Sequence, residues 1–150
     1  MFVDDLVEKS VFVFALRFLK LILNCQENIH MDIEKLIIEW SAIKDEITGH
    51  KNIDFSALKK LFKETYNYLE KYRTKKLVPK KISKLIFVIN DFGWTVSVSE
   101  KTPLHKFSKE ILFLIAAINK RFFTSDGDVN VIVGMIEKIS DRGFKTIKSQ

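Results

Sequence analysis

The chain has 150 residues, of which 47% are hydrophobic and 29% are charged, and it contains only five glycines and two prolines. This length suffices for one compact domain with a real core, and the scarcity of Gly and Pro argues against disorder, a collagen-like repeat or a β-rich fold. The sequence therefore predicts a single helix-dominated domain over residues 1–150.

Two helices are predicted in the first third of the chain. The first covers about 4–24, with acidic residues in its first turns, and it is then apolar on nearly every side, which is typical of a helix at the centre of a bundle. The second covers about 32–48 and ends at Gly49. Its apolar residues recur at spacings of three and four, as a buried helical face requires: Ile33, Leu36, Ile37, Trp40, Ile43 and Ile47.

The same region bears on cellular location. Asp4, Asp5 and Glu8 stand where a secretory signal needs positive charge, so the N-terminus is expected to be a mature helix. No segment approaches the roughly 18 unbroken apolar residues of a membrane span. The single cysteine, Cys25, has no second thiol to pair with and favours a reducing compartment. A cytoplasmic protein is therefore expected.

A third helix is predicted from the N-cap Asp54 to about residue 72, and a fourth from Pro79 to Gly93. The segment WTVSVSE, 94–100, alternates valines with small polar residues in the manner of a half-buried strand. No second strand is predicted to pair with it. It is interpreted as an extended linker on the helices or, alternatively, as an edge strand that pairs with a partner or a second copy.

A fifth helix is predicted over 103–123, with Thr102 as its N-cap, and its apolar middle places it at the centre of the bundle near the first helix. A sixth is predicted over 128–140, capped by Ser125 or Asp126, and a short basic tail from Phe144 is expected to be mobile. The prediction is thus all-α: a single compact bundle of about six helices, with the first and fifth central.

Residue types that carry enzymatic chemistry are scattered. His30, His50 and His105 lie far apart, and the glycines are isolated, so neither a metal site nor a phosphate-binding loop is predicted. Residues 126–137 match several ligand positions of a calcium loop, but Val131 stands where that loop needs glycine, which favours a helix. No cofactor, no metal and no catalytic residues are predicted, although a helical bundle can also assemble a site from distant residues.

The stretch KYRTKKLVPKKISK, 71–84, holds seven cations and no acidic residue. The formal net charge is +6, so the rest of the chain carries 6 − 7 = −1, and the positive excess is local. Cations at the end of one helix suit its dipole, whereas Lys80 and Lys81 at the start of the next oppose it. Residues placed against local preference suggest a function. The candidate partner-binding residues are Arg73, Lys75, Lys76, Lys80, Lys81 and Lys84.

Two functions fit this patch. The first is a small non-enzymatic binding or regulatory protein (an adaptor, inhibitor or immunity-type protein) that docks an acidic protein partner through the basic surface between the two helices. The alternative is a nucleic-acid-binding protein of low sequence specificity that uses the same lysines, with Tyr68 as a free stacking ring, while Tyr66 and Tyr72 are expected in the core. Specific base reading is not expected, because the helix that follows offers only lysines and Ser83 in its first turns.

Overall fold

The computed structural model describes the backbone of residues 2–124 and 126–145, and the side chains of 11–19, 32–124 and 126–145. Residue contacts divide the chain into two units, Met1–Glu34 and Lys35–Gln150. The expectation of one domain over 1–150 stays a prediction. Among the described residues, no helix has the length and apolar character that crossing a membrane requires.

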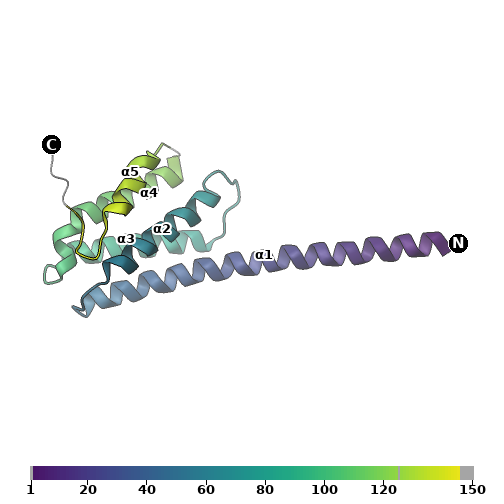
Figure 1. The fold of residues 1–150 in the computed structure, drawn as a ribbon, viewed down its shortest axis with the longest axis horizontal. Coiled ribbons are helices and arrows are strands. Elements are labelled where there is room, and N and C mark those ends of the chain that lie inside the picture. The colour runs from purple at the N-terminus through teal and green to yellow at the C-terminus, as the bar shows by residue number, and fades with distance from the viewer. Residues whose placement is uncertain (1, 125, 146–150) are drawn as a thin grey trace. The chain divides into compact units, whose positions relative to one another are not determined.

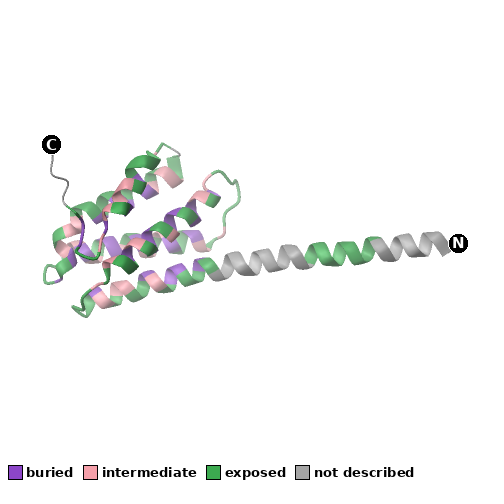
Figure 2. Cartoon of the chain, in the orientation of Figure 1, coloured by how far each residue is buried: buried purple, intermediate pink, exposed green. Residues whose placement is uncertain are grey.

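Helix α1 runs without a break over Phe2–Thr48 and joins the two helices predicted over 4–24 and 32–48. Nothing in the sequence interrupts it, because no glycine or proline precedes Gly49. In the part of α1 that belongs to the first unit, the side chains of residues 11–19 are described and are exposed, as Figure 2 shows. The central place expected of the first predicted helix in the bundle stays a prediction. Cys25 lies outside the residues whose side chains are described.

The unit Lys35–Gln150 contains the last turns of α1 and five further helical elements, with no strand among its described residues (Figure 1). These elements are α2 (Phe55–Tyr72), α3 (Lys81–Val98), a 3₁₀ turn η1 (Pro103–Phe107), α4 (Ser108–Thr124) and α5 (Val129–Lys138). Helix α4 contacts α2, α3, α5 and η1. Its buried residues recur at helical spacing: Ile111, Leu114, Ile115 and Ile118. The all-α bundle and the central place of the fifth predicted helix are confirmed.

The core of this unit is built around Trp40 of α1. Its indole packs edge-on against Phe62 of α2 and Phe92 of α3, each at a centroid distance of 4.9 Å. The indole Nε1–H donates a hydrogen bond of 2.9 Å to Thr65 Oγ1, so the one polar atom of this buried ring is satisfied. At the rim, Lys44 of α1 forms an ion pair with Asp91 of α3. These contacts join α1, α2 and α3.

Helix α3 continues through the segment that alternation predicted to be extended. Residues 94–98 are helical, so both the linker and the edge strand are wrong for them. The helical period of the buried residues explains why this segment is helical, because Val96 is buried four residues after Phe92 and extends the inner face of α3. The small polar side chains also suit a helix here, since the hydroxyls of Thr95 and Ser97 donate to the carbonyls of Asp91 and Trp94.

Gly93 lies inside α3 rather than at its end. A Cβ atom built there would stand 2.7 Å from Ile115 Cδ1 and 3.2 Å from Leu112 Cδ2, both on α4. The glycine therefore marks a close approach of α3 to α4, and a side chain at this position would require Ile115 to shift.

Residues 139–145 fold back on the bundle, so Phe144 and Lys145 do not begin a mobile tail, and residues 146–150 of the predicted tail lie outside the described residues. Helix α5 is capped by Asp128, whose carboxylate accepts a hydrogen bond of 2.8 Å from Asn130 N, rather than by Ser125 or Asp126. After α5 the chain turns, and Phe144 is buried with its ring 5.4 Å from that of Phe107. Apolar burial fixes this residue, which composition had assigned to a basic tail.

Candidate functional site: a lysine loop and an apolar pocket

Residues 73–84, here called the lysine loop, comprise the connection from α2 to α3 and the first turn of α3. Helix α2 ends at Tyr72, and a turn in which Lys75 N donates to Tyr72 O directs the chain away from it. Helix α3 then begins at Lys81, with Ile82 N bonded to the carbonyl of Pro79. The loop has exposed cations on both sides of its tip: Lys75, Lys76, Lys80 and Lys84.

Leu77 at the tip of the lysine loop is 89% exposed, and the adjacent Val78 is 44% exposed. Both lie between the lysine pairs 75–76 and 80–81 of the sequence. In the part of the chain that the structure describes, Lys76, Lys80 and Lys84 form no ion pair, whereas Lys59 and Lys63 of α2 both contact the carboxylate of Glu137. The loop thus presents an apolar tip close to Lys76, Lys80 and Lys84, which form no ion pair among the described residues.

Two of the six predicted cations are only partly exposed. The guanidinium of Arg73 lies beside Glu70, with Nε 3.4 Å from Oε2, and its side chain is 21% exposed. Lys81 is also partly buried and has an interaction within the chain. The structure therefore brings the predicted residues onto one connection, with Lys75, Lys76, Lys80 and Lys84 as its accessible charges.

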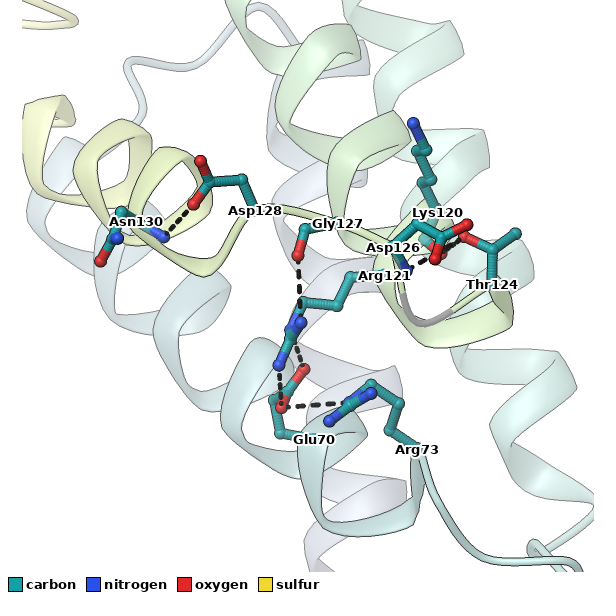
Figure 3. Close-up of polar contacts among 9 residues, drawn as sticks. All are labelled: Glu70, Arg73, Lys120, Arg121, Thr124, Asp126, Gly127, Asp128 and Asn130. Atoms are coloured by element: carbon teal, nitrogen blue, oxygen red, sulfur yellow. Dashed lines mark hydrogen bonds and ion pairs between the residues drawn. The ribbon is translucent and has the colours of Figure 1, made fainter.

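Glu70 belongs to a network that fixes the end of α2, as Figure 3 shows. The guanidinium of Arg121 on α4 forms a bidentate pair with the Glu70 carboxylate: Nε donates to Oε1 at 2.7 Å and Nη2 donates to Oε2 at 3.2 Å. Arg121 also donates a hydrogen bond of 3.0 Å to the carbonyl of Gly127, in the connection from α4 to α5. The hydrogen bond to Glu70 raises the pKa of Arg121 above its ordinary value. This network anchors the start of the lysine loop and was not predicted from sequence.

The tyrosines near the lysine loop belong to the core. Tyr66 and Tyr72 are buried as predicted, but Tyr68 is buried too and is not a free stacking ring. Its ring lies 5.2 Å from that of Tyr72. Helix α2 contacts both α4 and α5, so its buried face is wider than a single amphipathic stripe. Of the three tyrosines, none offers a base-stacking surface.

A second feature of the surface is a pocket of about 560 Å³ formed by α4, α5 and the segment after α5. Its apolar lining residues are Phe113, Val131, Met135 and Phe144. Four charged residues complete the lining: Lys109, Glu110, Lys138 and Lys145. Sequence reasoning missed this pocket, because its residues come from three segments and none of them forms a motif. The sequence signal is weak, because Phe113 and Val131 are only two of several apolar residues outside the buried faces of α4 and α5.

Among the residues whose side chains are described, no group of three His, Cys, Asp or Glu residues is placed to hold a metal ion. Comparison with known proteins gives no match: no family model, no curated protein and no solved structure is significantly similar to this chain.

Proposed function

We propose that this protein is a non-enzymatic, cytoplasmic binding protein that docks an acidic protein partner through the lysine loop. The observation that carries the proposal is the 89% exposure of Leu77 beside Lys76 and Lys80, which form no ion pair among the described residues. A partner that covers the exposed leucine at the loop tip removes apolar surface from water, which favours binding. The surrounding cations favour a partner whose apolar recess is rimmed with carboxylates.

The apolar tip distinguishes this partner from nucleic acid. Phosphate contacts come from cations and need no leucine, and single-strand binding adds aromatic stacking, for which the buried Tyr68 is not available. A protein surface uses both parts of the loop, with the apolar contact at the centre and the charges at the rim. The lysine loop, with its apolar tip and flanking cations, has the composition of a protein-binding surface. A role in regulation, as an adaptor or inhibitor, follows as part of the same proposal.

The experiment uses a fluorescein-labelled peptide in which glutamates surround two leucines, titrated with the full chain at low and physiological salt. The test variant replaces Lys75, Lys76 and Lys80 by Glu. The control variant replaces three exposed lysines outside the loop by Glu: Lys51, Lys101 and Lys120. Both variants have the same net charge, so they differ only in where the three positive charges are reversed.

The loop variant is expected to bind the peptide about tenfold more weakly than wild type, since exposed ion pairs contribute about 0.2–1 kcal/mol each. The control variant is expected to lose less than this. Equal losses in both variants would mean that only net charge matters, and would refute the proposal. The nucleic-acid alternative would be favoured by a different result: the peptide does not bind, whereas single-stranded DNA binds in a salt-sensitive manner and the loop variant does not bind it.

A further inference from the structure

The pocket between α4, α5 and residues 139–145 has walls that are held by specific contacts. Its third wall is a turn in which Gly143 N donates to Ser140 O at 2.9 Å, while the Ser140 hydroxyl donates to Gly143 O at 2.6 Å. Lys145 N then donates to the carbonyl of Lys138 at 3.2 Å, which ties this segment to the end of α5. The segment that contributes Phe144 and Lys145 to the pocket is therefore held by a hydrogen-bonded turn.

Gly143 is required in that turn for two reasons. Its φ of 93° lies in the left-handed region that favours glycine. In addition, a Cβ atom there would stand 2.6 Å from Cζ of Phe107, the ring against which Phe144 packs. The turn thus places Phe144 against Phe107 of the 3₁₀ turn η1, and Phe144 also lines the pocket.

The volume of about 560 Å³ lies within the roughly 300–1,000 Å³ typical of small-molecule sites. The α4 wall extends over only one turn, residues 109–113, whereas a groove for an amphipathic helix takes anchors from two turns or more. Met135 provides a flexible, polarizable surface that adapts to an alkyl chain. These dimensions favour a small molecule over a helix of a partner protein.

The charges at the pocket favour an anion. Three lysines and one glutamate line it, which gives 3 − 1 = +2, and no ion pair of Lys109, Lys138 or Lys145 occurs among the described residues. An apolar recess with cations at its edge is complementary to a molecule that has an alkyl chain and an anionic head. A long-chain carboxylate is the simplest molecule with both properties.

We propose that this pocket binds a medium- or long-chain carboxylate. The alkyl chain lies against Phe113, Val131 and Met135, and the carboxylate is held by lysines of the rim. This site is separate from the lysine loop, which connects α2 to α3, and it does not rest on the function proposed for that loop. Binding at the two sites is tested with different probes and different variants.

The experiment follows the methyl group of Met135 by NMR in protein with ¹³C-methyl methionine, titrated with decanoate below its micelle concentration. The chain has three methionines, and Met135→Leu assigns the Met135 signal. Decyltrimethylammonium tests the head group, because it pairs the same alkyl chain with the opposite charge. Acetate tests the chain, because it has the same head group and almost no alkyl part.

The matched variants are Phe113→Asp and Phe123→Asp. Both phenylalanines lie on α4 and are similarly exposed, 60% and 66%, but only Phe113 lines the pocket. We expect a saturable shift of the Met135 signal with decanoate, at least tenfold weaker binding in Phe113→Asp, and unchanged binding in Phe123→Asp. Replacement of Lys138 and Lys145 by Glu should weaken binding of decanoate and strengthen binding of the ammonium compound.

Three results would overturn the assignment. The first is the absence of a saturable Met135 shift with decanoate. The second is equal affinity of the two phenylalanine variants for decanoate, which would indicate unspecific adsorption to exposed apolar residues. The third is equal binding of the anionic and cationic amphiphiles by wild type, which would show that the lysines do not bind the carboxylate. Loss of peptide binding at the lysine loop would change none of these readouts.

Discussion

The close approach of α3 to α4 predicts opposite effects of one substitution at two helical glycines. Gly93→Ala introduces a Cβ atom 2.7 Å from Ile115 Cδ1, in a region where Ile115 is almost fully buried and has little room to move. Gly134→Ala, on α5, introduces a Cβ atom that meets nothing within 4 Å. Both changes replace glycine by alanine inside a helix, so the gain in helix propensity is common to both.

The magnitudes follow from these two contributions. Alanine in a helix interior stabilises by about 1 kcal/mol relative to glycine. Overpacking of a buried contact costs about 1–3 kcal/mol. Gly134→Ala should therefore raise the free energy of unfolding by up to about 1 kcal/mol. Gly93→Ala should leave it unchanged or lower it by up to about 2 kcal/mol, so that the two variants differ by about 1–3 kcal/mol.

Urea unfolding followed by circular dichroism at 222 nm, a standard wavelength for helix, measures this difference, with equal slopes for the two variants as the check that only stability has changed. An equal gain in stability for Gly93→Ala and Gly134→Ala would refute the packing of α3 on α4 described above. It would mean that α3 and α4 have space between them at this point, and that Gly93 is an ordinary solvent-facing position.

Two further predictions test the core and the surface charges. Thr65→Val leaves the buried indole N–H of Trp40 without its acceptor, so the free energy of unfolding should fall by about 1–3 kcal/mol in urea titrations, and an unchanged value would contradict the hydrogen bond. The hydrogen bond from Lys59 lowers the pKa of Glu137 below its ordinary value of 4.5. Its folded pKa is therefore below its unfolded pKa, and the stability it contributes is present above pH 4.5 and is lost as the pH falls through the lowered folded value. Wild type should thus lose its advantage over Glu137→Gln in this acidic range, and a constant difference from pH 7 downward would contradict the contact.

The fold could be predicted from sequence where the helical period is strong and the helix ends carry clear signals. Asp54 caps α2 as predicted, and in α1 the residues Leu36, Trp40 and Ile47 are buried at the predicted spacing. The prediction was wrong where a short alternating pattern competed with a longer helical one, as at 94–98. It was also wrong where Gly93 was interpreted as a helix end, because a glycine required for close packing and one that ends a helix look the same in sequence.

The candidate sites show the same distinction. The lysine loop could be found because its charges are contiguous, but the contact of Glu70 with Arg121 depends on the packing of α2 against α4. The apolar pocket could not be found, since its lining residues are separated by up to 36 positions, from Lys109 to Lys145, and meet only after the turn at Gly143 closes. Local patterns predict local surfaces, and sites formed by tertiary contacts require the fold.

The central claim is that the lysine loop binds a protein surface through Leu77 as well as through its charges. The most direct test compares wild type with Leu77→Ser in fluorescence anisotropy titrations against the acidic leucine-containing peptide and against single-stranded DNA. Leu77 is 89% exposed, so this substitution should leave the fold and its stability unchanged. We predict about tenfold to hundredfold weaker binding of the peptide, because a buried leucine contributes about 1.5–3 kcal/mol, and no change in any binding of DNA. Unchanged affinity for the peptide would contradict the account, because the loop would then act through its charges alone.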